Sequence, residues 1–380
     1  MIYFDNAATS FPKPEAVIRA MENAMRTCGN PGRGSHRLAM NASEILYDCR
    51  SEAAKFFDAE SSENVVFTWN ATAALNQAIK GLARKGDHLL ISDLEHNAVL
   101  RPVQKLADQG RITYGIFPSF ATDPGRTAEM ICRAVEERIT PKTKLLICTH
   151  ASNICSAVMP IRELGALCKK HRIKLIVDAS QSAGHLPISV RQMQIDALCL
   201  PGHKGMLGPQ GSGLLIWGKD VVAETLLEGG SGIRSLERTM PPESPERFEA
   251  GTVATPAVAG LLAGIREVRR RGLSSIARQE FRLSGMLGDA LSEMPDVKME
   301  APHLDGPILL FHVKGIPSDA LSGALSARNI CTRAGYHCAG LAHKTLGTPD
   351  GGAVRVSFGA ENTEDEVAAF VRTMSEILQK

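Results

Sequence analysis

The segment from Asp178 to Gly213 constrains the fold more than any other stretch of the chain. It follows residues 173–177 (Ile-Lys-Leu-Ile-Val), a short β-branched run typical of a buried strand. An acid at the carboxyl end of such a strand faces the crevice where open α/β sheets bind ligands. Lys204 follows within Pro-Gly-His-Lys-Gly (201–205), among small and turn-forming residues, where its amine could reach the same crevice.

An acid and a lysine in one crevice are what pyridoxal phosphate (PLP) requires. The lysine holds this cofactor as a Schiff base, and the acid keeps the pyridine nitrogen protonated so that the ring withdraws electrons. The alternative interpretation is that Asp178 caps a helix and Lys204 lies on a surface turn. Spacing alone favours that alternative, because acids at strand ends often cap helices. The rest of the chain reverses the preference.

Length and composition narrow the class of protein. A chain of 380 residues suggests two or three domains, and a net charge of +2 gives no electrostatic case for nucleic acid or an anionic membrane as partner. We expect no signal peptide, because the amino terminus has no basic segment followed by an apolar core, and no membrane span, because no apolar run approaches about 18 residues. The nine cysteines are odd in number and none is spaced Cys-x-x-Cys, which disfavours disulfides and a zinc site and favours a reducing cytoplasm.

Strand-like runs alternate with helical stretches between residues 64 and 217. This alternation indicates right-handed crossovers and an α/β fold with a mostly parallel, covered sheet of seven strands. We place the large domain at residues 15–255. The seven predicted strands are 65–68, 88–92, 112–117, 144–149, 173–177, 197–200 and 213–217.

A second, smaller α+β domain is predicted from residues 1–14 and 256–380. Its predicted elements are helices over 257–271 and 276–294, a strand over 308–313, a helix over 318–327, two short strands and a last helix. Thr363 and Glu366 form a capping-box pattern at the start of that last helix. In the large domain we predict a helix to about Arg26. The irregular stretch 28–36 that follows is either a functional loop or a plain connector.

Polar groups follow several strands of the predicted sheet at the point where each ends. Ala71-Thr72 opens a helix and could bind a phosphate, or Thr72 could be an ordinary cap. His96 could stack on a cofactor ring or move protons, or could be a structural histidine. Asn153 and Asp178 follow two further strands. Four such groups at one sheet edge indicate a ligand site more specifically than any one of them does.

A second cluster lies in the predicted small domain, at Arg333-Ala-Gly-Tyr-His-Cys-Ala-Gly (333–340). Cys338 stands beside a histidine in a loop that contains glycine, where a thiol near cations can become a nucleophile. For a lone loop cysteine an idle thiol is the commoner outcome. Arg355 lies in an otherwise apolar run and needs a carboxylate partner, which is either a substrate or an internal acid.

Taken together, these residues resemble the class V aminotransferase group of fold type I PLP enzymes, and within it the cysteine desulfurases and selenocysteine lyases. The Arg-x-Gly-x-His-Cys loop is similar to that of the second desulfurase group, whose members work with sulfur-accepting partner proteins. The resemblance covers nearly the whole chain and rests on residues 3–9, 95–97, 152–153, Asp178 with Gln181, 202–204, 248–252, 333–338 and Arg355.

The resemblance implies a set of cofactor contacts. Lys204 would carry PLP and move protons, Asp178 would pair with the pyridine nitrogen, and His96 would stack over the ring. Gln181 would contact the phenolic oxygen. The residues implied to bind the phosphate are Ala71, Thr72, His203 and, from the second subunit of a homodimer, Thr252.

The resemblance also implies a substrate and a reaction. Asn153, Arg333 and Arg355 would bind the carboxylate of L-cysteine, with L-selenocysteine as an alternative substrate. Cys338 would take the substrate sulfur as a persulfide while alanine leaves, and no metal is required. The chain departs from the family at Pro201, where serine is usual, because proline offers neither a hydroxyl nor an N–H to the phosphate. It also departs at residues 154–156 and at Asn97.

The sequence therefore predicts a PLP-dependent cysteine desulfurase. The rivals are a selenocysteine lyase, another class V aminotransferase or C–S lyase that does not use the thiol, and a non-catalytic scaffold with this fold. Lys204, Asp178 and Arg355 disfavour the scaffold, because a scaffold needs no carboxylate-binding arginine. The sequence leaves open the sulfur acceptor, the pathway and whether the Cys338 loop is ordered.

Overall fold

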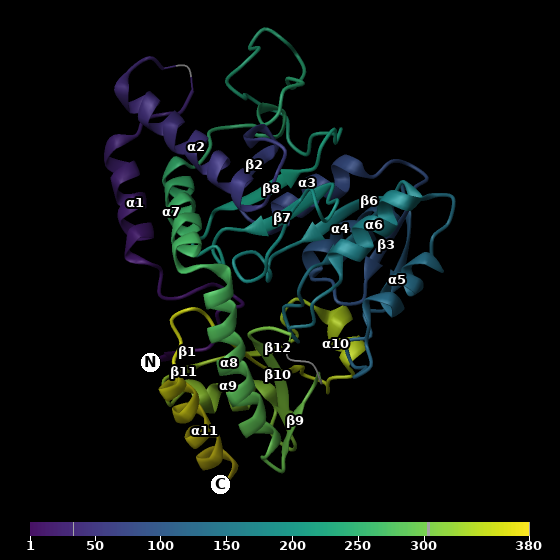
Figure 1. Ribbon diagram of the computed structural model, residues 1–380, viewed down its shortest axis with the longest axis vertical. Coiled ribbons are helices and arrows are strands. Elements are labelled where there is room, and N and C mark those ends of the chain that lie inside the picture. Colours follow the sequence, from purple (N-terminus) through teal and green to yellow (C-terminus); the bar gives the residue numbers. More distant parts are fainter. Residues whose placement is uncertain (33, 302–304, 380) are drawn as a thin grey trace.

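The computed structural model describes residues 1–32, 34–301 and 305–379, which form a large seven-stranded sheet, a smaller four-stranded sheet and a two-stranded pair. Figure 1 shows how these parts are arranged. The predicted α/β fold with a mostly parallel seven-stranded sheet is confirmed, and each strand boundary lies within one residue of the prediction. The strands of the large sheet are β2 (Val65–Thr68), β3 (His88–Ser92), β4 (Thr113–Phe117), β5 (Thr143–Thr149), β6 (Lys174–Asp178), β7 (Ala197–Pro201) and β8 (Gly213–Trp217).

The strand order of the large sheet is β2-β8-β7-β6-β5-β3-β4. Strands β3 to β7 run parallel, and β8 is antiparallel to both of its neighbours. The chain adds β4 on one side of β3 and β5 on the other, so the direction of winding reverses between β3 and β5. Open α/β sheets bind ligands beside the carboxyl ends of the strands at such a reversal.

Helices cover both faces of the large sheet, which explains why its central strands are apolar along their whole length. Helices α3 and α4 contribute to the core on one face, and α2, α5, α6 and α7 to the core on the other. The helices of this part are α1 (Glu15–Thr27), α2 (Arg37–Phe56), α3 (Ala71–Leu82), α4 (Asn97–Asp108), α5 (Ala128–Glu136), α6 (Ile161–His171) and α7 (Thr255–Arg271).

The smaller sheet has the order β12-β13-β10-β9 and is antiparallel throughout. A separate parallel pair joins β1 to β11, so the first residues of the chain lie beside residues 330–331. The strands of this part are β1 (Ile2–Tyr3), β9 (Val297–Met299), β10 (Ile308–Val313), β11 (Ile330–Cys331), β12 (Arg333–Gly335) and β13 (Ala353–Ser357).

Four helices accompany the smaller sheet, and both chain ends lie in this part of the molecule (Figure 1). They are α8 (Leu273–Ser292), α9 (Ser318–Ser326), α10 (Gly340–Leu346) and α11 (Glu364–Leu378). The predicted capping box at Thr363 and Glu366 is confirmed at the start of α11. The division of the chain at residues 14 and 255 stays a prediction.

The predicted irregular stretch 28–36 has no helix or strand among the residues described, and its Arg33 lies outside them. Within residues 1–32, 34–301 and 305–379, no helix combines the length and the apolar character that crossing a membrane would require.

Candidate active site

A hollow of about 280 Å³ opens at the carboxyl ends of β3, β5, β6 and β7. Small molecules and cofactors bind in concave sites of this kind. The structure brings most of the predicted site residues into its wall. These are Ala71, Thr72, His96, Asn153, Asp178, Gln181, His203 and Lys204.

Asp178 is the last residue of β6, and only 3% of it is exposed. Its Oδ1 accepts hydrogen bonds from the amide of Ser180 at 2.9 Å and from the Ser180 hydroxyl at 2.5 Å. Both donors come from the turn that follows the strand. The carboxylate is therefore fixed at the edge of the hollow before any ligand arrives.

Lys204 lies in the turn after β7 and lines the same hollow. Burial lowers the pKa of its amine to about 8, although the charge of Asp178 opposes this shift. With that pKa, about a tenth of the amine is unprotonated at pH 7. An unprotonated, partly desolvated lysine is the form that condenses with an aldehyde.

His96 precedes α4 and caps it, since its Nδ1 accepts a hydrogen bond from the amide of Ala98 at 3.0 Å. The neutral ring therefore carries its proton on Nε2. Burial lowers the pKa of His96 and favours this neutral form. A neutral, oriented imidazole in the wall of the hollow is suited to stacking on an aromatic ring and to exchanging a proton through Nε2.

The other end of the hollow suits a phosphate. Asn70 caps α3, because its side chain accepts a hydrogen bond from the amide of Ala73 at 2.9 Å. Ala71 and Thr72 follow Asn70 and line the hollow at the positive end of this helix. His203 also lines it, and its buried Nδ1 has no hydrogen-bond partner within the chain as described. A buried, unpaired ring nitrogen is unfavourable unless a ligand completes it.

Two further residues of the wall bear on the predicted contacts. Pro201 lines the hollow where the family usually has serine, so this position offers the phosphate no donor. Gln181 donates from Nε2 to the carbonyl of Ala7 at 2.9 Å, which orients its amide.

Arg355 lies beside the hollow and is only 2% exposed. It donates from Nη2 to Asp5 at 2.6 Å and from Nη1 to the carbonyl of Asn153 at 3.0 Å. Of the two partners that the sequence left open, the structure shows the internal acid, Asp5. The Nε of Arg355 is buried without a partner in the described chain, so one donor is left for a ligand.

Arg333 stands opposite Arg355 in the cross-strand register of β12 and β13. Arg333 itself is exposed and does not line the hollow. The two adjacent guanidinium groups carry more charge than the carboxylate of Asp5 balances. A substrate carboxylate is an anion that would balance it.

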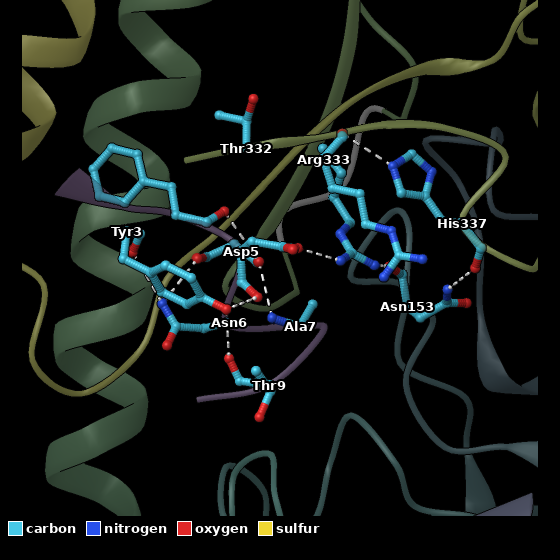
Figure 2. A network of polar contacts seen from close by, with 12 residues as sticks. Tyr3, Asp5, Asn6, Ala7, Thr9, Asn153, Thr332, Arg333 and His337 are labelled. Carbon is cyan, nitrogen blue, oxygen red and sulfur yellow. Dashed lines mark hydrogen bonds and ion pairs between the residues drawn. The ribbon is translucent and has the colours of Figure 1, made fainter. Parts of the chain in front are cut away.

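Cys338 is exposed and lies between β12 and α10. Two hydrogen bonds attach its loop to the large-sheet side. Asn97 N–H donates to the carbonyl of Cys338 at 2.8 Å. Asn153 Nδ2 donates to the carbonyl of His337 at 2.9 Å, as Figure 2 shows. Since Asn97 follows His96 and Asn153 lines the hollow, the thiol loop is attached at the rim of the candidate site.

Thr252 is not brought to this site within one chain. It lines a different hollow together with Phe67, Trp69 and Phe248. Its predicted contact with the phosphate therefore requires a second subunit.

Several contacts of the site could not be anticipated from motifs. Asp5 and Asn97 both lie in stretches that carry the resemblance, but their partners, Arg355 and the carbonyl of Cys338, are distant in sequence. Ala7 acts through its backbone carbonyl, for which a sequence gives no signal.

A buried acid, a buried lysine and a histidine beside the carboxyl ends of the parallel strands are the arrangement expected of fold type I PLP-dependent enzymes. The sequence model of the family described as "Aminotransferase class-V" matches residues 2–370. The chain belongs to this family, as the motifs predicted.

Relatives and solved structures agree over the full length of the chain. A probable cysteine desulfurase of Pyrococcus abyssi is 34% identical, covering 100% of this chain and 94% of its own. One from Methanothermobacter thermautotrophicus is 32% identical, covering 99% and 94%. The apo structure of a cysteine desulfurase from Thermococcus onnurineus NA1 superposes with a TM-score of 0.90 at 32% identity, covering 100% and 94%.

Proposed function

We propose that this protein is a PLP-dependent cysteine desulfurase that converts L-cysteine to L-alanine and takes up the sulfur on Cys338. One observation carries the proposal: the hollow that holds Asp178, Lys204 and His96 has the loop of an exposed cysteine attached to its rim. The names of the relatives support the same activity.

The residues of the hollow fit the cofactor. When bound, PLP supplies an electron sink that makes the bonds at the substrate Cα labile and allows the Cβ–S bond to break. Lys204 would hold the cofactor and, once released, take and return the Cα proton. Asp178 would pair with the ring nitrogen, and His96 would stack on the ring. Ala71, Thr72 and the unpaired Nδ1 of His203 would bind the phosphate.

The substrate carboxylate would bind at the unpaired Nε of Arg355, near the positive charge of Arg333 and the amide of Asn153. The thiolate of Cys338 attacks the substrate sulfur, so that an S–S bond forms as the Cβ–S bond breaks. The bonding electron pair stays with the carbon, which takes up a proton, and the skeleton leaves as alanine.

The proposal extends to partners and location. A homodimer would bring Thr252 of one subunit to the phosphate of the other, which is consistent with its place in a different hollow of its own chain. The exposure of Cys338 suits transfer of the persulfide to a sulfur-accepting protein. The nine cysteines are free thiols, which fits a reducing cytoplasm.

The test is to incubate the protein with PLP, L-cysteine and a reductant, and to measure alanine and sulfide for the wild type and for Cys338→Ser. We expect equal amounts of alanine and sulfide from the wild type and loss of both in the variant. Pyruvate and ammonia in place of alanine, or full activity of the variant, would show a lyase that does not use the thiol. A large preference for L-selenocysteine would indicate a selenocysteine lyase.

A Lys204→Ala variant tests the non-catalytic alternative. The wild type should show the absorbance band of bound PLP near the visible edge, and the variant should lose it. A wild-type protein without such a band would not be a PLP enzyme.

A further inference from the structure

The imidazole of His337, the residue before Cys338, is buried beneath the thiol loop and is 5% exposed. Its Nε2 lies 3.1 Å from the carbonyl oxygen of Arg333 (Figure 2). A carbonyl oxygen only accepts, so Nε2 of His337 carries a proton and donates it. When the ring is neutral, its Nδ1 is left as an acceptor.

The partner of that Nδ1 is His343, whose Nε2 lies 3.2 Å away. The two rings are nearly parallel, with centroids 5.4 Å apart and planes 13° from parallel, and His343 is 2% exposed. Because Nδ1 of His337 accepts, Nε2 of His343 donates. The Nδ1 of His343 then accepts from the hydroxyl of Thr348 at 2.9 Å. A directed chain thus runs from Thr348 through both rings to the carbonyl of Arg333.

Both imidazoles are neutral at physiological pH, as this chain of hydrogen bonds requires. Burial lowers the pKa of His337 to about 3, with the nearby charge of Arg355 acting in the same direction. Burial lowers the pKa of His343 to about 4. Each ring therefore offers one donor and one acceptor, and the hydrogen-bond chain uses both.

The thiol loop needs such support because its backbone is strained. His337 has φ 50° and Cys338 has φ 55°, so two consecutive residues other than glycine occupy the left-handed region. This conformation persists only where the surroundings impose it. Asn153 and Asn97 bind the two carbonyls of the turn, and the imidazole chain binds the side chain between them.

We propose that His343 is a positioning residue for Cys338: by donating to the ring of His337, it holds the left-handed turn that presents the thiol at the rim of the active site. His343 acts through another residue, and neither the sequence motifs nor the family resemblance assigned it a role. The inference rests on the proposed function only in taking Cys338 as the nucleophile.

The experiment compares His343→Leu, which removes the donor, with His343→Gln, which can supply an amide N–H at a similar reach. Hydrogen exchange of the holoenzyme is followed by mass spectrometry over residues 336–339, with α11 as the internal control. We expect the loop to exchange about five-fold faster in His343→Leu, the effect of losing one ordinary hydrogen bond. Exchange in His343→Gln and in α11 should stay within two-fold of the wild type. Thr348→Val should show the same pattern more weakly.

Activity is measured on the same samples. We expect sulfide formation to fall about five-fold in His343→Leu and to recover in His343→Gln, while the absorbance of bound PLP is unchanged. Unchanged loop exchange in His343→Leu, or faster exchange in α11 to the same degree, would overturn the positioning role. If the wild type forms no sulfide, the proposed function fails, while the exchange data still decide the role of His343 in the loop.

Discussion

Replacing Asp5 by asparagine tests whether the internal ion pair of Arg355 stabilises the protein. Arg355 is 2% exposed at its side chain and Asp5 20%, and their atoms are 2.6 Å apart. In Asp5→Asn the amide oxygen can still accept from Nη2, so the shape and one hydrogen bond are kept. The negative charge is lost, and Arg355 is left beside Arg333 without a counter-charge.

The expected cost follows from the burial of the pair. Removing one partner of a fully buried ion pair costs about 3–5 kcal/mol. Water still reaches Asp5, and asparagine keeps one hydrogen bond, so we expect the free energy of unfolding to fall by about 2 kcal/mol. With a urea m-value of about 3 kcal/mol per molar, the unfolding midpoint should fall by about 0.7 M.

Urea unfolding, followed by circular dichroism, measures this shift. The matched control is Glu15→Gln, which removes the same charge from a pair with Arg19 whose side chains are 65% and 76% exposed. An exposed pair contributes at most about 0.5 kcal/mol, so the control midpoint should move by less than about 0.2 M. Equal midpoints for the two variants would refute the argument that Arg355 depends on Asp5.

Three further substitutions test other parts of the site. Gly184→Ala should lower the free energy of unfolding by about 3 kcal/mol or more and weaken PLP binding. The reason is that φ of Gly184 is +88° and a Cβ would lie 2.1 Å from a carbonyl oxygen in the loop of Lys204. The control in thermal unfolding is Gly285→Ala, where a Cβ meets open space. Burial raises the pKa of Glu95 from 4.5 to about 8, so the folded state holds a proton that the unfolded state loses. The resulting stability is complete below about pH 4.5 and is lost as the pH rises to about 8, so unfolding midpoints over this range should fall less steeply in Glu95→Gln. Asp178 raises the pKa of Lys204, so Asp178→Asn should move the pH profile of Lys204 acylation in the apoprotein to lower pH, and a move to higher pH would contradict the electrostatic account.

The large sheet and the wall of the hollow were predictable because two local rules suffice for them. Buried parallel strands are continuous apolar runs, and the residues that follow such strands meet at one edge. The positions of His96, Asn153 and Asp178 after strands were therefore enough to predict that they lie close together, and all three line the hollow. Helix α2 was not among the predicted elements, since its buried face consists mainly of alanines such as Ala39 and Ala42, which give a weak apolar pattern.

The partners of the second cluster were not predictable in the same way. Asp5 and Arg355 are 350 positions apart, and no periodic pattern pairs them. The sequence could show that Arg355 needed a carboxylate but not which one. Likewise, His343 belongs to no recognised motif. Its proposed role depends on α10, which places the ring of His343 against that of His337. Contacts of this kind depend on the packing of the two sheets, which local patterns do not encode.

The N-terminal segment joins the separate parts of the site. Backbone pairing of β1 with β11 places it in the small-sheet part, yet Ala7 contacts Gln181 in the wall of the hollow. Asp5 binds Arg355, and the carbonyl of Ala7 binds Gln181. Asp5 and Ala7, two positions apart, thus hold one group proposed to bind the substrate and one proposed to bind the cofactor.

The same segment also holds the loop of Lys204. The carbonyl of His203, in the peptide bond before Lys204, accepts from the amide of Ser10 at 3.0 Å and from the ammonium of Lys13 at 2.8 Å. Burial lowers the pKa of Lys13 to about 8, so the cation is desolvated where it meets the carbonyl. A shift of this one segment would displace the lysine loop together with Gln181 and Arg355. The relative positions of the groups proposed to bind the substrate and the cofactor therefore depend on how the two sheets are joined as much as on those groups themselves.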